Sequence, residues 1–535
     1  MQDAHLLEVL VVVLAAVLVL SVVARWLRIA APLVLLVGGV PLAFVPWMAG
    51  VALPPEVVLL LFLPALLYWE ALTTSWRELR ANLRVVVLTS VFLVLATAGV
   101  VAVVGHALGL SWPVAWVLGA VVAPTDATAV TAIATGLPRR FLTTLRAESL
   151  VNDGTALVVF AVALAVATGE QSFSWPGALG RFALSYLGGA LAGLLVAWLS
   201  VQARRIATDR LLENTVDVLT PFAAYLLAEL VGASGVLAVV VVGLGMARMG
   251  PRITAARTRL QARGFWQIST FLLNGALFVL VGLQLRGALA ALQDYSLGQA
   301  VLDAGLVALA VMGTRVVWNY TTPYIIRAVD RRPVQRARRI GARQRLVGAW
   351  AGFRGGVSLA AALAVPLTLV DGRPFPGRDL IIVVTFGVIL VTLVVQGLTL
   401  PAVLRFARLP EDTGVVSEEH LARRTATRAG LDALADTAAR LGVSPAAVDR
   451  VREDYREHLV LLRDGPDHDG DADHAERDRA DQEDYQRLRA ALLAEKRRAV
   501  LALRDEGTID DIVLRRVQST FDTEEIRLTA AAEPD

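Results

Sequence analysis

Long apolar runs constrain this chain more than any other feature of its sequence. A helix that crosses the hydrocarbon core of a bilayer needs about 20 mostly apolar residues. About thirteen such stretches precede residue 408, centred near positions 16, 40, 63, 94, 124, 157, 189, 221, 241, 275, 308, 357 and 392. Hydrophobic residues make up 56% of the chain, which is more than a soluble core requires. We therefore predict an all-α polytopic membrane domain over residues 1–407, with about 13 transmembrane helices.

Arginine residues mark every second loop between these stretches. They fall within residues 25–28, 77–84, 139–146, 204–210, 248–263, 327–345 and 405–408. The positive-inside rule makes these loops cytoplasmic. We expect a multi-pass protein of the inner (plasma) membrane with its N-terminus outside and its C-terminus inside. Because the positive charge is spread over short loops and not gathered in one patch, nucleic acid is not an expected partner.

The last part of the chain, residues 408–535, has a different character. It carries 20 basic and 30 acidic residues, and its apolar residues follow a helical spacing. Residues 464–484 are too acidic and polar to bury a core, so we predict a flexible linker there. The sequence thus predicts a small cytoplasmic tail, part α-helical and part disordered, which is either a regulatory domain or a solvated appendage.

Two of the apolar stretches are interrupted by residues that break a helix. Pro124 removes a backbone donor beside Asp126, and Gly355 and Gly356 follow an arginine, Arg354, at membrane depth. If the spans form two halves, the interruptions fall in the fifth span of each half. Matched broken helices are typical of transporters whose inverted repeats cross at a midplane site. A carboxylate and a guanidinium could neutralise the opposed dipole ends of such half-helices.

A polar cluster opens the next stretch, at residues 148–155. On a helix Ser149 and Asp153 share one face, while Glu148, Asn152 and Thr155 share the adjacent face. Asp153, Ser149 and Thr125, with carbonyl groups near Pro124, offer the oxygen ligands that a hard cation prefers. Because burial favours the protonated form of a carboxyl group, a proton and a cation would compete for Asp153.

Other buried charges receive structural interpretations. We predict an ion pair between Glu148 and Arg354, since removing one partner would leave an uncompensated buried charge. Asp217 and Asp303 could line the dimer face or an access funnel, but we favour a structural pairing of each with a neighbouring group. Arg315 is expected to brace the cytoplasmic half and is a further site candidate.

These motifs resemble the monovalent cation:proton antiporter-1 family, the bacterial sodium/proton antiporters that are related to animal sodium/proton exchangers. The resemblance covers roughly residues 6–407. It rests on APTDATAV at 123–130, ESLVNDGTALVVF at 148–160, FVLVGLQL at 278–285 and FRGGVSLA at 353–360, with a softer match in FLPALLYWEAL at 62–72.

The resemblance implies a homodimer in which a core domain moves like an elevator against an interface domain. It also implies ion ligation by Asp153, Asn152, Ser149 and Asp126, with Thr125 contributing at the unwound segment. The Asn-Asp pair at 152 and 153 is similar to that of the electroneutral branch of the family.

Two positions differ from the family pattern. Ala127 stands where the family usually has proline after Thr-Asp. Trp69 matches the position at which some relatives have an acidic residue, which leaves the adjacent Glu70 as a further site candidate.

The function that follows is exchange of a monovalent cation for protons by alternating access, serving pH and sodium homeostasis. Na+ is the expected cation, with Li+ or K+ also open, so a K+/H+ antiporter of the same architecture is the alternative. Two other classes compete: an intramembrane aspartyl protease using Asp126 and Asp153, and a cation channel. Neither explains two matched helix breaks. We expect no enzyme activity and no cofactor; the cation and the proton are substrates.

Overall fold

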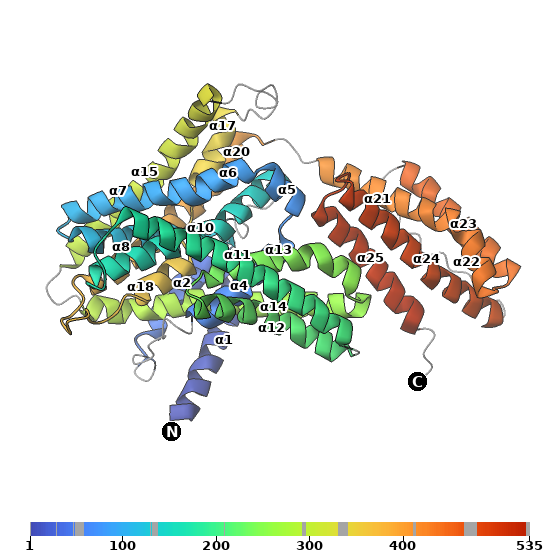
Figure 1. The fold of residues 1–535 in the computed structure, drawn as a ribbon, viewed down its shortest axis with the longest axis horizontal. Helices are drawn as coiled ribbons and strands as arrows, with labels where there is room; N and C mark the ends of the chain where they lie inside the picture. The colour runs from blue at the N-terminus through green and yellow to red at the C-terminus, as the bar shows by residue number, and fades with distance from the viewer. Residues whose placement is uncertain are drawn as a thin grey trace.

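A computed structural model describes the chain over most of its length, and that part is predominantly helical. The described residues are 2–27, 29–45, 48, 58–128, 130, 137–207, 209–291, 296–329, 341–409, 413–464 and 479–530. Within them, β-structure is limited to one isolated bridge between Thr368 and Pro374. The predicted all-α fold is confirmed for this part of the chain (Figure 1).

The helices before residue 408 match the apolar stretches. They are α1 (Gln2–Leu27), α2 (Ala31–Leu42), η1 (Val58–Phe62) continuing into α4 (Leu63–Thr73), α5 (Trp76–Ala81), α6 (Leu83–Val87) with η2 (Leu88–Leu93) and α7 (Val94–Ala107), α8 (Trp112–Val122), α10 (Arg139–Ala167), α11 (Trp175–Ile206), α12 (Arg210–Leu230), α13 (Gly235–Ile253), α14 (Ala256–Ala291), α15 (Leu297–Val329), α17 (Ala342–Trp350), α18 (Gly356–Leu363), and α19 (Arg378–Val391) with η3 (Thr392–Gln396) and α20 (Gly397–Ala407). The π-helical segments η1, η2 and η3 each join an α-helix without a loop.

Eight helical segments of the described chain are long and apolar enough to cross a bilayer, and three shorter apolar helices accompany them. Each of the predicted centres falls in a helix or, for position 124, in a break between helices. The exact number of spans stays a prediction. Large apolar side chains such as Leu18, Leu187 and Leu309 remain more than 60% exposed. Such surface requires an apolar solvent, which the hydrocarbon of a membrane provides.

The two predicted helix breaks are confirmed, and they touch. The chain is unwound at residues 123–126 after α8 and at residues 351–355 between α17 and α18. The backbone N–H of Asp126 donates to the carbonyl of Phe353 at 2.9 Å, so each segment satisfies part of the other's free backbone. Both breaks lie in protein interior and not at the lipid surface, since Pro124 and Phe353 are buried.

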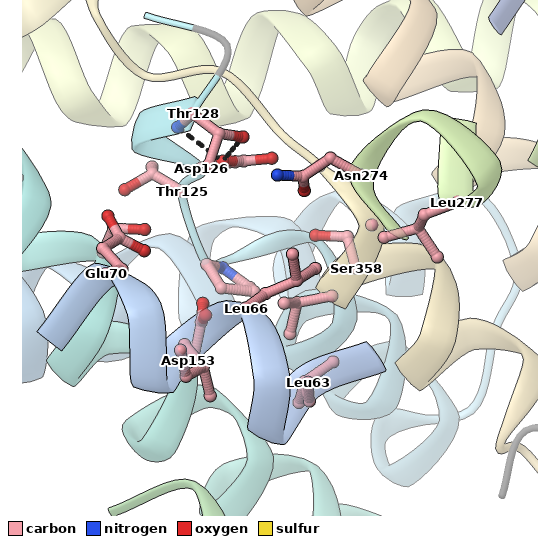
Figure 2. Close-up of a pocket in the computed structure, with 16 residues that line it drawn as sticks. Leu63, Leu66, Glu70, Thr125, Asp126, Thr128, Asp153, Asn274, Leu277 and Ser358 are labelled. Carbon is pink, nitrogen blue, oxygen red and sulfur yellow. Dashed lines mark hydrogen bonds between the residues drawn. The ribbon is translucent and has the colours of Figure 1, made fainter. Parts of the chain in front are cut away.

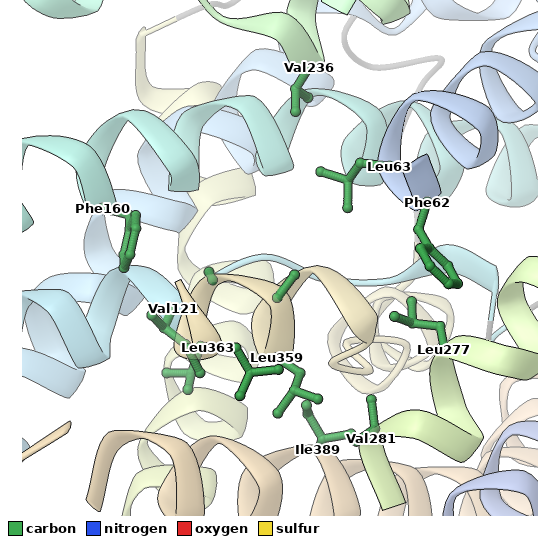
Figure 3. Close-up of a cluster of buried hydrophobic side chains, with 14 of the residues drawn as sticks. Phe62, Leu63, Val121, Phe160, Val236, Leu277, Val281, Leu359, Leu363 and Ile389 are labelled. Atoms are coloured by element: carbon green, nitrogen blue, oxygen red, sulfur yellow. The ribbon is translucent and has the colours of Figure 1, made fainter. Parts of the chain in front are cut away.

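A continuous apolar core holds the crossing in place. Figure 3 shows Val121 of α8, Phe160 of α10, and Leu359 and Leu363 of α18 among its members, with Leu277 of α14 close by. These helices are therefore fixed against one another around the two unwound segments.

The described residues of the tail form five helices, which make a bundle at one end of the molecule (Figure 1). They are α21 (Thr413–Asp432), α22 (Leu434–Leu441), α23 (Pro445–Asp464), α24 (Arg479–Asp505) and α25 (Asp511–Ala530). Two small apolar clusters, one around Val513 and Val517 and one around Leu488 and Leu492, bury their inner faces. Most of the predicted linker, residues 465–478, lies outside the described residues, but residues 479–484 begin α24, where the sequence analysis expected no structure.

Candidate functional site

A pocket lies where the two unwound segments meet α4, α10 and α14. Figure 2 shows Asp126, Asp153 and Glu70 arranged around it. Its lining residues are Leu63, Leu66, Leu67, Glu70, Pro124, Thr125, Asp126, Thr128, Ser149, Asp153, Asn274, Leu277, Gly355, Gly356, Val357 and Ser358. Three carboxyl groups from three separate segments thus share one small cavity.

Asp126 sits at the start of the helical turn that follows the first break. Its Oδ1 accepts hydrogen bonds from the backbone N–H of Thr128 at 2.7 Å and from Thr128 Oγ1 at 2.5 Å. A Cβ atom on Gly355, the residue before α18, would overlap the Asp126 carboxylate. The carboxylate therefore lies at the N-terminal end of α18, where the helix dipole favours a negative charge.

Arg354 occupies the opposite end of the crossing. Its side chain is 1% exposed, and its Nε donates to the carbonyl of Val122, the last residue of α8, at 2.7 Å. Its Nη1 donates to the carbonyl of Gly352 at 2.6 Å. The guanidinium thus lies at the C-terminal end of α8, where its positive charge complements the negative end of the helix dipole, as the sequence analysis expected for a cation at the crossing.

The first polar face of α10 points into the pocket. Ser149 and Asp153 are each 4% exposed and both line the cavity, which confirms that they share one face. Ser149 Oγ accepts from the backbone N–H of Ala127 at 3.4 Å, so it supports the chain just after the first break. Asp153 lies within electrostatic range of Glu70 and Asp126.

Two residues on the adjacent face of α10 hold the Thr125 side chain by hydrogen bonds. Asn152 Nδ2 donates to Thr125 Oγ1 at 2.7 Å, and Thr125 Oγ1 donates to Glu148 Oε1 at 3.3 Å. Asn152 and Glu148 are not among the pocket's lining residues, so both act on the pocket through Thr125. Thr155, the third member of this face, instead bonds to Tyr186 Oη at 2.5 Å.

The direct ion pair of Glu148 is with Arg315 and not with Arg354 as predicted, although Arg354 lies within electrostatic range of Glu148. Glu148 Oε1 pairs with Arg315 Nη1 at 2.5 Å, and both side chains are almost completely buried. Arg315, which extends from α15, also donates from Nε to the carbonyl of Gly348 at 3.0 Å. The Arg315 stem packs where a Cβ on Gly352 would otherwise sit, and Arg354 is engaged by backbone carbonyls. Arg315 therefore braces the second broken helix.

The structure places Glu70 in the pocket together with two residues that the sequence analysis did not select as site residues. Asn274 of α14 and Ser358 of α18 also line the cavity. Ser358 is 1% exposed, and its Oγ has no hydrogen-bond partner among the described residues. Selecting membrane residues by charge overlooked both; the single asparagine in the apolar run at 271–283 was the available signal for Asn274.

A separate buried charge outside the pocket has a structural role. Asp217 accepts hydrogen bonds from Tyr68 Oη at 3.0 Å and Trp266 Nε1 at 2.7 Å, and it pairs with Arg204. These contacts join α4, α11, α12 and α14, and they confirm the predicted structural pairing of Asp217. No such partner of Asp303 is found among the described residues.

Comparisons with known proteins agree with this geometry. The family model described as "Sodium/hydrogen exchanger, transmembrane" matches residues 12–406. An uncharacterized Na+/H+ exchanger of Mycobacterium tuberculosis (strain ATCC 25618 / H37Rv) is 48% identical over 99% of this chain and 97% of its own. The Na+/H+ antiporter ApNhaP of Aphanothece halophytica is 34% identical over 74% of this chain and 73% of its own.

A solved structure has a similar fold. The sodium proton antiporter MjNhaP1 from Methanocaldococcus jannaschii at pH 8 matches with a TM-score of 0.61 and 21% identity, over 76% of this chain and all of that chain. The family resemblance drawn from the motifs is confirmed by the sequence comparisons. The chain therefore belongs to the sodium/hydrogen exchanger family.

Proposed function

We propose that this protein exchanges Na+ for protons across the plasma membrane by alternating access. One observation carries the proposal: Asp153 of α10 and Asp126 of the first break line the same buried pocket, beside the crossing of two broken helices. The relatives named as Na+/H+ exchangers and antiporters support Na+ as the cation. They do not favour K+ as the main cation or an aspartyl protease.

The chemistry is competition for a shared set of oxygen atoms. Na+ would be bound by carboxylate and hydroxyl oxygens of Asp153, Asp126, Ser149 and Thr125, the ligand type that a hard cation prefers. A proton on Asp153 removes one of the negative charges that hold the cation in the pocket. The pocket would therefore hold Na+ or a proton, and each trip across the membrane would carry one of them.

Asn152, Glu148 and Arg315 would act as supports in this scheme. They fix the Thr125 hydroxyl and the second broken helix through the hydrogen bonds described above. Glu70 is the remaining acidic group of the pocket, and we propose that it contributes to cation binding from α4.

Orientation and assembly are also proposals. The acidic tail contacts the arginine-rich loops, with Glu418 bonded to Arg77 and Arg139, so tail and loops lie on the same side of the protein. The positive-inside rule makes that side cytoplasmic. We further propose a homodimer, which light scattering of the purified protein in detergent would detect as twice the chain mass.

Transport in vesicles tests the proposed function. Purified protein in liposomes should dissipate an imposed pH gradient when Na+ is added, as reported by a pH-sensitive dye. Asp153→Asn should abolish the response. Asp371→Asn, the same change at an exposed acid remote from the pocket, should leave it intact. Full exchange by Asp153→Asn would refute the site, and a K+ response equal to the Na+ response would refute Na+ selectivity.

A further inference from the structure

The tail makes a buried polar contact with the end of the helix that carries Glu70. Arg515, in the first turns of α25, donates from Nη1 to the carbonyl of Leu72 at 3.3 Å and from Nη2 to the carbonyl of Thr73 at 2.5 Å. These are the last two residues of α4. A guanidinium placed there satisfies carbonyl groups that have no partner within the helix, and it complements the negative end of the helix dipole.

Two aspartates extend the same contact beyond α4. Asp510 Oδ2 accepts from Ser75 Oγ at 2.6 Å, and Asp511 Oδ2 accepts from the backbone N–H of Trp76 at 2.9 Å. Ser75 and Asp510 are 0% exposed and Asp511 is 7% exposed. Burial of this kind is costly unless the groups are paired, so the contact is specific and not a casual approach of two charged surfaces.

This contact lies within one helical turn of the pocket. The carbonyl of Glu70 accepts from Thr73 Oγ1 at 3.1 Å and from Thr74 Oγ1 at 2.7 Å, so the last turn of α4 is closed by its own side chains. Arg515 holds the outer end of that same turn. A shift or rotation of the turn would move the Glu70 side chain relative to Asp126 and Asp153.

We propose that Arg515 is a positioning residue for the cation pocket: by capping α4 it fixes Glu70, so that the docked tail sets the apparent affinity for the transported cation. The proposal rests on the proposed role of the pocket in cation binding. Burial lowers the pKa of Arg515 to about 10, so the side chain remains charged at neutral pH. The alternative is that the tail is an appendage whose contacts leave transport unchanged.

Transport by full-length variants in vesicles distinguishes a positioning role of Arg515 from a tail that leaves transport unchanged. Arg515→Gln should raise the Na+ concentration for half-maximal exchange by about fivefold, within the range that a charge at a helix end spans, and should change the maximal rate less than twofold. Arg515→Lys should recover part of the loss. Arg516→Gln is the matched control, because Arg516 is the next residue of α25 and its side chain is 57% exposed; its ion pair within the described part of the chain is with Glu419 of the tail.

Measuring the effect of Arg515→Gln in a protein that already carries Glu70→Gln shows whether Arg515 acts through Glu70. In Glu70→Gln protein, adding Arg515→Gln should cause no further change in the half-saturating Na+ concentration, because the group that Arg515 positions is already absent. An equal shift in both backgrounds, or no shift in the parent, would overturn the proposal, as would equal effects of the Arg515 and Arg516 variants.

The outcome stays interpretable if Arg515→Gln does not fold. Asp511→Asn weakens the neighbouring bond to Trp76 and leaves Arg515 in place, and it should give a smaller shift in the same direction; an unchanged half-saturating concentration would refute the proposal. Failure of the proposed function is a separate result, because only that failure would leave Asp153→Asn fully active.

Discussion

Replacing Arg315 by methionine tests the ion pair that braces the broken helices. The change removes a guanidinium whose Nη1 lies 2.5 Å from Glu148 Oε1, and whose Nε bonds to the carbonyl of Gly348. Methionine fills most of the space of the arginine stem, so the loss is mainly electrostatic. Glu148 is then left in a buried site, where Thr125 Oγ1 is the side-chain donor that the described residues provide.

The expected cost follows from the burial of both groups. The side chains of Arg315 and Glu148 are 3% and 5% exposed. Breaking a pair buried to this degree costs about 3–5 kcal/mol, because one charge is left without compensation. Replacing both charges, in Arg315→Met with Glu148→Gln, should cost less than Arg315→Met alone, since no buried charge then remains unpaired. We expect a coupling energy of about 2–3 kcal/mol between the two positions.

The free energy of unfolding can be measured by titrating a denaturing detergent into mixed micelles of the parent, the two single variants and the double variant. The matched cycle uses Arg354→Met with Glu148→Gln. Arg354 bonds to the carbonyls of Val122 and Gly352, so its coupling to Glu148 should stay below about 1 kcal/mol. Additive costs for Arg315 and Glu148, or a larger coupling for Arg354, would refute the assignment of the pair.

Further predictions concern the pocket and the tail. Gly355→Ala places a methyl group on the Asp126 carboxylate and should reduce exchange by at least about tenfold in vesicles, whereas Gly264→Ala, with open space around it, should not. Ser358→Ala removes an unpartnered hydroxyl of the pocket and should raise the half-saturating Na+ concentration by about two- to fivefold, with the maximal rate little changed. Burial would raise the pKa of Glu418, but hydrogen bonds from two arginines and a backbone N–H hold that pKa below its usual value. Because the pKa of Glu418 is lower in the docked state, its ionised carboxylate stabilises docking of the tail at pH values above the pKa of the free side chain, and this contribution is lost as the pH falls through the lowered pKa. Hydrogen exchange at residues 74–82, corrected for intrinsic rates, should therefore be constant between about pH 5 and 8 and rise below about pH 4.

Local chemistry made the helix breaks and the polar faces of α10 predictable. Pro124 cannot donate a backbone hydrogen bond, and the glycines at 355 and 356 allow the close approach of other groups, so the interruptions are visible in the sequence itself. The common face of Ser149 and Asp153 follows from the helical repeat alone. Both features depend on residues near one another in the chain.

The partner of Glu148 depends on packing that no local pattern encodes. Arg315 and Arg354 are both arginines at membrane depth, and each could compensate a buried carboxylate. The structure decides between them because Arg354 donates to the carbonyls of Val122 and Gly352, while α15 brings Arg315 against Gly352 and into an ion pair with Glu148. For the same reason, the contact of Arg515 with α4, more than 440 residues away in sequence, has no signal in the periodicity of either helix.

The hydrogen bond from the Asp126 backbone to Phe353 has a mechanical consequence. It joins the two unwound segments directly, so a movement of one segment displaces the other unless this bond breaks. A bound ion would then move together with the two unwound segments, whose charged groups Asp126 and Arg354 keep their separation. Exposure to one side of the membrane or the other would then come from a movement of the whole crossing, together with the helices packed on it, and not from a rearrangement within it.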